Sequence, residues 1–368
     1  MNQALDKLTI KGFKSIHELE DFELTSLNVI VGANGAGKSN FIAFFKLLNA
    51  LMDGTLNRFV RDNGGAQDLL FGGPKKTPKI EFSTRFGSRG FRFNLVATPS
   101  NDVAIEDEAR YYSNSQSKWW ELGDSSDGTS KMVAEVKRNA SDSRYSKPVF
   151  DAIASWKIYH FHDTSPTAPM RSEEIVQDNK VLRTNASNIG AFLLKLNTNT
   201  PSAYKEIVNA IKLVTPFFDD FLLEPFKRGE KEVVNLSWLQ KGSDYPMQPY
   251  HLSDGSIRFI CLATALLQPE PPATIIIDEP ELGLHPAAIA ILAELIKAAS
   301  ERTQVVIATQ SPDLINYFSI ADVIVANRKD GSTTLTRLQE KEYEGWLEDY
   351  SVGELWNKNI ITGGPVNE

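Results

Sequence analysis

The sequence predicts an α/β protein in which helices cover both faces of a parallel β-sheet. In the last third of the chain, short apolar runs rich in β-branched residues alternate with longer segments that are apolar at helical spacing. Near the N-terminus, the apolar run at 27–32 leads through a glycine loop into another segment of the helical kind. Parallel strands need long crossover connections, which helices usually provide, so this alternation favours a parallel sheet.

The clearest elements lie at the two ends of the chain. At the N-terminus we expect strands at 8–13 and 27–32 and a helix that starts at Ser39. Further along we expect a helix after Ser253, a strand at 273–280, a helix at 287–300, a strand at 304–310, a helix from Pro312 and a strand at 322–328.

The middle of the chain is harder to interpret. Residues 79–86 and 91–97 alternate apolar and polar side chains, as antiparallel strands do. Residues 113–131 contain the small polar residues that favour turns, so we expect an exposed loop there. We also expect a buried strand at 156–162 and, further on, two helices separated near Pro201.

Composition and charge limit the classes of function. The net charge of −8 argues against a chain whose whole surface wraps nucleic acid. The stretch from Lys75 to Arg92 is locally basic, and it is either a solvated hairpin, which we favour, or a DNA-contacting surface. The single cysteine, Cys261, excludes an intramolecular disulfide framework. Because no apolar signal segment or membrane span is found, we expect a cytoplasmic protein.

A glycine-rich loop provides the first candidate site. Residues 32–39, GANGAGKS, match the phosphate-binding pattern G-x-x-x-x-G-K-[ST] at every fixed position. Glycines let the backbone aim its N–H groups at phosphate oxygens, and the following helix adds its positive dipole end. We assign Lys38 to the β- and γ-phosphates of ATP and Ser39 to Mg²⁺. The predicted nucleotide-binding residues are Gly32, Ala33, Asn34, Gly35, Ala36, Gly37, Lys38, Ser39 and Asn40.

A pair of carboxylates ends a later strand. The segment TIIIDEPELGLHP places Asp278 and Glu279 at the carboxyl end of a parallel strand, where α/β proteins bind ligands. We assign Asp278 to Mg²⁺ and Glu279 to the water that attacks the γ-phosphate. On its own, a pair of acidic residues at a strand end is as often without any catalytic role. The presence of the glycine loop in the same chain favours the catalytic interpretation.

A third motif makes the chain resemble a known superfamily. The segment LSDGSIR at 252–258 resembles the signature loop LSGGQ of ABC ATPases and precedes the carboxylate strand, as it does in that family. With the glycine loop, the DEPELGLHP segment and the opening LTIKGFKSI, it makes the chain similar to the SMC, RecF and OLD branch of ABC-type P-loop ATPases. In that family the signature of one subunit caps the γ-phosphate bound to the other, so the resemblance assigns Ser253 and Gly255 to act in trans. The competent state would then be an ATP-sandwich homodimer.

The resemblance also implies an organisation for the chain. It predicts a single ABC-type ATPase head over 1–368 with a mixed sheet. The parts would be an N-terminal lobe with antiparallel strands and the glycine loop at 1–100, an insertion of mixed strands and helices at 101–247, and a C-terminal lobe with signature, carboxylate strand and switch loop at 248–368.

The chain departs from the family pattern at two positions, and one family residue is not obvious in it. Gln310 occupies the position at which transporter-type members have a switch histidine. As a γ-phosphate sensor, a glutamine can donate a hydrogen bond but cannot carry a proton, which predicts slow turnover. Asp254 replaces the first signature glycine, which is unexpected beside a phosphate unless its side chain caps the helix and points away. For the family's Mg²⁺-binding glutamine, Gln67 is the nearest candidate, with a turn residue as the alternative.

Three histidines have two interpretations each. His160 and His162 share one face of the expected strand, and we favour a structural role or proximity to the nucleotide over a zinc site. His285 would lie in a dimer-facing loop or start a helix.

The sequence supports two main hypotheses of function. The first is an ATPase that couples dimerisation to work on DNA or on a separate effector such as a nuclease, in genome maintenance or, by analogy, in anti-phage defence. The second is a nucleotide-gated scaffold in which slow hydrolysis only resets an assembly. A transporter ATPase subunit is less favoured because EPELGLHP and LTIKGFKSI resemble the DNA-linked branch. The segment after Gln310 lacks a carboxylate cluster for two metals, so we expect no nuclease domain.

Overall fold

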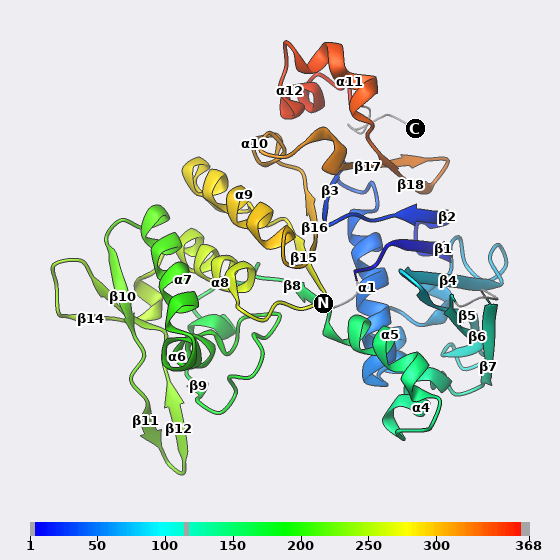
Figure 1. Cartoon of the computed structure of the whole chain (residues 1–368), viewed down its shortest axis with the longest axis horizontal. Coiled ribbons are helices and arrows are strands. Elements are labelled where there is room, and N and C mark those ends of the chain that lie inside the picture. The colour runs from blue at the N-terminus through cyan, green and yellow to red at the C-terminus, as the bar shows by residue number, and fades with distance from the viewer. Residues whose placement is uncertain (1–3, 114–117, 362–368) are drawn as a thin grey trace.

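The computed structural model describes residues 4–113 and 118–361, and its centre is a six-stranded sheet (Figure 1). The strand order is β18-β17-β3-β16-β15-β8. The strands are β3 (Leu27–Val31), β8 (Lys157–Tyr159), β15 (Thr274–Asp278), β16 (Gln304–Thr309), β17 (Val323–Lys329) and β18 (Ser332–Arg337). All neighbours pair in parallel except β17 and β18, which are antiparallel. The predicted α/β class with a mixed sheet is confirmed.

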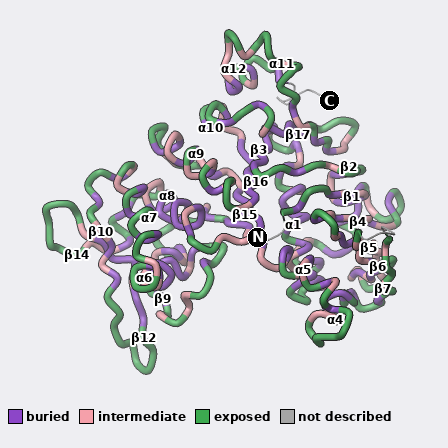
Figure 2. Tube along the Cα trace, in the orientation of Figure 1, coloured by how far each residue is buried: buried purple, intermediate pink, exposed green. Residues whose placement is uncertain are grey.

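Successive residues of the central strands face two different cores. In β15, Ile275 and Ile277 belong to one buried cluster, whereas Ile276 between them belongs to the other. The strands are therefore buried on both faces, as the purple centre of Figure 2 shows. Strands in such sheets are nearly continuous β-branched runs, which is why their sequences predict them well.

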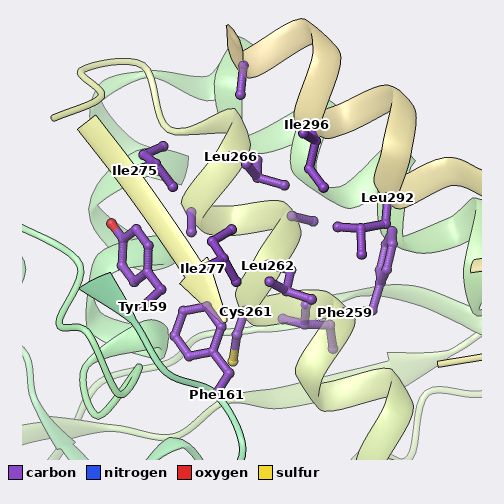
Figure 3. Close-up of a cluster of buried hydrophobic side chains, with 14 of the residues drawn as sticks. Tyr159, Phe161, Phe259, Cys261, Leu262, Leu266, Ile275, Ile277, Leu292 and Ile296 are labelled. Atoms are coloured by element: carbon purple, nitrogen blue, oxygen red, sulfur yellow. The ribbon is translucent and has the colours of Figure 1, made fainter. Parts of the chain in front are cut away.

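Helices α8 (Asp254–Leu267) and α9 (Pro286–Ser300) cover one face of this sheet, and α6 (Ile189–Asn199) and α7 (Pro201–Val214) pack on these two helices. Figure 3 shows α8 between β15 and α9, with Leu262 and Leu266 of α8 in the same cluster as Ile277 and Leu292. The predicted break between two helices is confirmed, because Pro201 occupies the first turn of α7, where a proline has no hydrogen bond to lose.

The opposite face is covered by α1 (Lys38–Asp53), α5 (Ser143–Ser155) and a second sheet. This sheet is antiparallel, with the order β2-β1-β4-β5-β6-β7. Its strands are β1 (Lys7–Phe13), β2 (Ile16–Glu23), β4 (Lys79–Phe86), β5 (Arg89–Ala97), β6 (Val103–Tyr112) and β7 (Lys118–Ser125). The helix α1 lies between the two sheets and buries three phenylalanines, Phe41, Phe44 and Phe45, without exposed area.

One expectation for this region needs correction. Residues 118–125 form strand β7 rather than part of an exposed loop, and residues 114–117 of that expected loop lie outside the described residues. Tyr111 of β6 and Trp119 of β7 are directly opposite each other, and their rings are in contact. Cross-strand aromatic pairs of this kind stabilise strand pairing more than the nearby polar residues favour a loop. Strands β6 and β7 continue the antiparallel sheet beyond residue 100.

The remaining elements are short. They are α2 (Leu56–Asp62), α3 (Ala66–Leu69), α4 (Lys131–Lys137), β9 (Glu174–Ile175), β10 (Phe218–Leu222), β11 (Phe226–Arg228), β12 (Lys231–Val234), β13 (Ser237–Gln240), β14 (Pro246–Met247), α10 (Pro312–Ile315), α11 (Glu340–Leu347) and α12 (Val352–Asn357). Strands β9 to β14 make two small antiparallel sheets beside α6 and α7. Within the described residues, no helix combines the length and apolar character needed to span a bilayer.

A buried carboxylate in the insertion predicts a pH-dependent stability. Glu174 is 3% exposed, accepts a hydrogen bond from the Ala191 backbone at 2.8 Å, and has no partner for its second oxygen. Burial raises the pKa of Glu174 to about 8. Between its ordinary pKa and about 8 the unfolded chain loses this proton while the folded chain keeps it, so stability falls as pH rises.

We expect the free energy of unfolding to fall by roughly 1.4 kcal/mol per pH unit across this window from Glu174 alone. Glu174→Gln removes the titration, so its stability should fall less between pH 5.5 and 8 than that of the wild type. Denaturant unfolding at several pH values measures the difference. Parallel pH profiles for the two proteins would contradict the assignment.

Candidate functional site

The glycine loop joins β3 to α1 and has the backbone shape of an anion cradle. Gly35 and Gly37 have φ values of 81° and 103°, which favour glycine over other residues. A Cβ on Gly37 would lie 1.9 Å from Thr333 Oγ1, so β18 approaches the loop too closely for a side chain. Helix α1 starts directly after Gly37, and its N-terminal N–H groups face the loop.

Lys38 lies at the start of α1 with its ammonium folded back over the loop. Its Nζ donates to the carbonyl oxygens of Gly32 at 2.6 Å and Ala33 at 3.2 Å. Burial lowers the pKa of Lys38, and the nearby Glu279, Asp278 and Glu281 oppose that shift. A buried cation held by two neutral carbonyls beside a helix N-terminus suits an incoming phosphate, because both features favour negative charge.

Two distant segments fix the loop. Thr333 Oγ1 donates to Ala36 O at 2.9 Å, and the same hydroxyl lies 2.7 Å from Ser15 Oγ. Asn40 Nδ2 donates to Ser15 Oγ at 2.6 Å, so this predicted nucleotide-binding side chain is held by the turn between β1 and β2. The sequence analysis missed Ser15 and Thr333, whose roles depend on contacts between residues far apart in the chain.

The carboxyl ends of β15 and β8 bring Asp278 close to two histidines. Because β8 ends at Tyr159, His160 and His162 follow the strand, and His162 Nε2 lies 2.9 Å from Asp278 O. The rings of His160 and His162 are 4.2 Å apart. Burial and the charge of Glu279 raise the pKa of Asp278.

Glu279 has a strained backbone and a defined partner. Its φ is 47°, a left-handed conformation that costs a glutamate free energy and that clusters at functional sites. The Gln310 side chain donates from Nε2 to Glu279 Oε1 at 2.6 Å. The structure therefore brings together the predicted base and the predicted γ-phosphate sensor, from the ends of neighbouring strands β15 and β16.

A third carboxylate, which the sequence analysis did not single out, lies beside this pair. Glu281 Oε1 accepts from Thr309 Oγ1 at 2.5 Å, while its Oε2 has no hydrogen-bond partner. Burial raises the pKa of Glu281. Within the described residues, no cluster of three or more His, Cys, Asp and Glu side chains is arranged to hold a metal. A Mg²⁺ at Asp278 would therefore take further ligands from Ser39, phosphate and water.

The signature segment starts helix α8. Ser253 caps this helix by accepting from the Ser256 backbone at 3.1 Å. Asp254 does not cap the helix as expected; its carboxylate is held to one side by Arg171, at 3.0 Å. The same Arg171 guanidinium donates to the carbonyls of Pro249 and Leu252, and its side chain is only 6% exposed.

A second buried arginine ties α8 to the strand ends. Arg258 donates to Phe161 O and His162 O, both at 2.9 Å, and to Leu282 O. The signature helix is thus joined to the segment beside Asp278 and to the turn after Glu279. Arg258 lies inside the signature segment, and a charged residue within an apolar helix indicates in the sequence that it has a specific partner. No such pattern in the sequence marks Arg171.

Gly255 allows the closest approach between the signature helix and the turn after Glu279. A Cβ at this position would lie 2.6 Å from Gly283 O, a backbone atom that cannot move alone. We expect Gly255→Ala to lower the free energy of unfolding by about 1–3 kcal/mol through overpacking. Gly345→Ala is the matched control, because nothing lies within 4 Å of that helical position. Thermal unfolding of both variants tests this, and equal stability would refute the steric argument.

Two predicted residues lie elsewhere. Gln67 is exposed on α3, where its backbone N–H donates to Asn101 Oδ1 at 3.0 Å. His285 caps α9 by accepting from the Ala287 backbone at 3.2 Å, which is the helix-start alternative.

Comparisons with known proteins agree with this geometry. The sequence profile of one family, described as "AAA domain, putative AbiEii toxin, Type IV TA system", matches residues 27–316. The chain belongs to this AAA-domain family. The match spans the glycine loop, the signature segment, the carboxylate strand and Gln310. No curated protein matches the AAA-domain chain in sequence.

Two solved structures show that the AAA-domain chain has the fold of SMC heads. One is an SMC head bound to the C-terminal winged-helix domain of ScpA; it is 15% identical, has a TM-score of 0.59, and the alignment covers 93% of this chain and 99% of that one. The other is an SMC head with an extended coiled coil bound to the C-terminal domain of ScpA, from Pyrococcus furiosus; it is 15% identical, has a TM-score of 0.54, and the alignment covers 94% and 99%. The resemblance to an ABC-type P-loop ATPase is confirmed.

Proposed function

We propose that the chain binds and hydrolyses ATP with Mg²⁺ in a head-to-tail homodimer. The observation that carries this proposal is the meeting of the glycine loop, Asp278, Glu279 and Gln310 at one edge of the central sheet. The family match and the SMC-head fold support nucleotide binding at that edge.

Each side chain has a task that its position supports. Lys38 would leave the carbonyls of Gly32 and Ala33 to hold the β- and γ-phosphates. Glu279 would accept the proton of the attacking water, with Gln310 orienting its carboxylate. Mg²⁺ bound by Ser39 and Asp278 would neutralise charge on the phosphates.

The signature segment supports the arrangement in trans. Ser253 and Gly255 lie at the exposed N-terminus of α8, where backbone N–H groups favour a phosphate. Arg171 pairs with Asp254 at 3.0 Å, and this cation would offset the charge of the acidic residue in the signature. Arg258 connects the signature to His162 and hence to the metal position of the same subunit.

Complementation tests the head-to-tail arrangement. Lys38→Ala keeps an intact signature, and Ser253→Arg keeps an intact glycine loop; each variant alone should release little phosphate. In an equal mixture, half of the dimers would carry one complete composite site, so roughly a quarter of the wild-type rate should return. A mixture as inactive as its components would exclude catalysis in trans.

The nucleotide-gated scaffold is the second candidate, because Gln310 cannot carry a proton as a switch histidine does. If turnover is very slow while ATP still drives dimerisation, the scaffold is favoured. Gln310→His should then raise the rate of phosphate release.

The biological role is proposed on weaker support. The family description names a toxin of a type IV toxin–antitoxin system, and both SMC heads are bound to a partner protein. We propose that this head works with a separate effector such as a nuclease, or on DNA, in the cytoplasm. We also propose 1–368 as a single head whose N-terminal lobe runs through β7, followed by the insertion and the C-terminal lobe.

A further inference from the structure

An aromatic cavity is lined by residues of β6, β7 and the start of α5. Strands β6 and β7 lie at the outer end of the antiparallel sheet (Figure 1). Its volume is about 240 Å³, and its lining consists of Arg110, Tyr112, Trp120, Asp142 and Tyr145. The rings of Tyr112 and Tyr145 are 5.8 Å apart and meet edge to face. Ordinary small-molecule pockets start at about 300 Å³, so this cavity suits one flat ring system.

The cavity wall is built rather than accidental. Arg110 is 13% exposed, lies 5.4 Å from the Tyr145 ring, and pairs with Glu135 at 2.7 Å. It also donates to Ser146 Oγ at 3.2 Å, which fixes the guanidinium against α5. Trp120 faces Arg110 across the β6–β7 pair and is 49% exposed, although a tryptophan is costly to leave in water.

Three cations surround the opening. Lys118 lies 5.7 Å from the Trp120 ring, Arg89 lies 5.7 Å from the Tyr112 ring, and Arg144 lies 4.8 Å from the Tyr145 ring. Within the part of the chain that the structure describes, none of the three forms an ion pair with a carboxylate. Other cations of this sheet, such as Lys7 and Arg92, are paired with glutamates. Three cations without a carboxylate partner therefore surround the cavity, where the acidic Asp142 lies 3.8 Å from Arg110.

The opposite face of the same strands carries a separate cluster of cations and aromatic rings. The Arg85 guanidinium stacks 3.4 Å from the Tyr111 ring and lies 4.7 Å from Trp119. Gly90 makes this possible, because a Cβ there would lie 3.0 Å from the Arg85 side chain and 3.3 Å from that of Tyr111. Alternating cationic and aromatic groups are what single-stranded nucleic acid requires, since phosphates need the charge and unstacked bases need the rings.

We propose that this cavity and its rim bind single-stranded nucleic acid. One unstacked base enters between Tyr112, Trp120 and Tyr145, and the flanking phosphates lie on Lys118, Arg89 and Arg144. A duplex fits poorly, because its bases stay stacked and paired. The proposal rests on the proposed function in naming the target of the ATPase head, but the binding itself needs no ATP.

Fluorescence anisotropy with labelled oligothymidine and oligouridine, and with a duplex of equal length, tests the proposal without nucleotide. We expect Trp120→Ala to weaken single-strand binding about tenfold, the worth of one stacked base. Trp120→Phe should restore most of it. Trp346→Ala is the matched control, because Trp346 on α11 is 46% exposed and should leave binding unchanged.

Salt dependence separates the phosphate contacts from the stacking. Lys118→Ala should reduce the slope of log affinity against log salt by about 0.7, whereas Trp120→Ala should leave the slope unchanged. The proposal is overturned if the duplex binds as tightly as the single strand, if Trp120→Ala binds like the wild type, or if an acidic peptide competes equally. Absence of oligonucleotide binding with intact ATP hydrolysis rejects this inference alone; loss of ATP hydrolysis with intact oligonucleotide binding rejects only the proposed function.

Discussion

Replacing Lys38 by alanine should lower the rate of ATP hydrolysis at least about 100-fold, the usual cost of removing a preorganised charge from a reacting centre. The buried Lys38 ammonium lies over the glycine loop, where its two hydrogen bonds go to neutral carbonyls. A phosphate would replace those neutral acceptors by anionic ones, so the full gain from this side chain appears only when ATP is bound. Phosphate release with excess Mg²⁺ and ATP measures the loss.

Binding should fail along with catalysis in this variant. ATP present at 100 times its Kd stabilises a protein by about 2.7 kcal/mol, so the wild type should show a clear rise in unfolding temperature with ATP. Lys38→Ala should show almost none, although its unfolding temperature without ATP should stay close to that of the wild type. Lys297→Ala, which removes a half-exposed lysine from α9, controls for charge loss. An unchanged ATP-dependent shift in Lys38→Ala would show that the nucleotide binds elsewhere.

Local spacing explains which parts of the fold could be predicted. The glycine loop is encoded by eight consecutive residues, and β15 and β16 are continuous β-branched runs because both of their faces are buried. The sequence around β7 contains no such run. That strand forms because Trp119 and Trp120 find partners on β6 and cations on β4 and β5, which only the folded sheet brings together.

The same distinction applies to the site. Asp278 and Glu279 were predictable because they end a strand, whereas the position of His162 depends on β8 pairing with β15 across more than a hundred residues. Arg171 and Arg258 act through backbone carbonyls, which leave no pattern in the side chains they contact.

Replacing Glu279 by glutamine should separate ATP binding from hydrolysis. Glutamine keeps the volume of the side chain and an oxygen that can accept from Gln310 Nε2, but it cannot accept the proton of the attacking water. We expect the turnover rate to fall by roughly 10²–10⁴, the usual contribution of a general base, while the ATP-dependent rise in unfolding temperature remains. Because ATP would stay intact at the interface, light scattering should show a dimer that persists with ATP and is absent without it.

Glu281→Gln is the matched control for this experiment. It makes the same chemical change two residues away. The Glu281 carboxylate is buried, which raises its pKa, and it accepts a hydrogen bond from Thr309. Its turnover should fall less than about tenfold, since only orientation of the strand end is affected. If Glu279→Gln hydrolyses ATP like the wild type, the strained conformation at Glu279 has another purpose and the base lies elsewhere. If it loses hydrolysis but never dimerises with ATP, the site acts within one subunit, and the trans role of Ser253 and Gly255 is wrong.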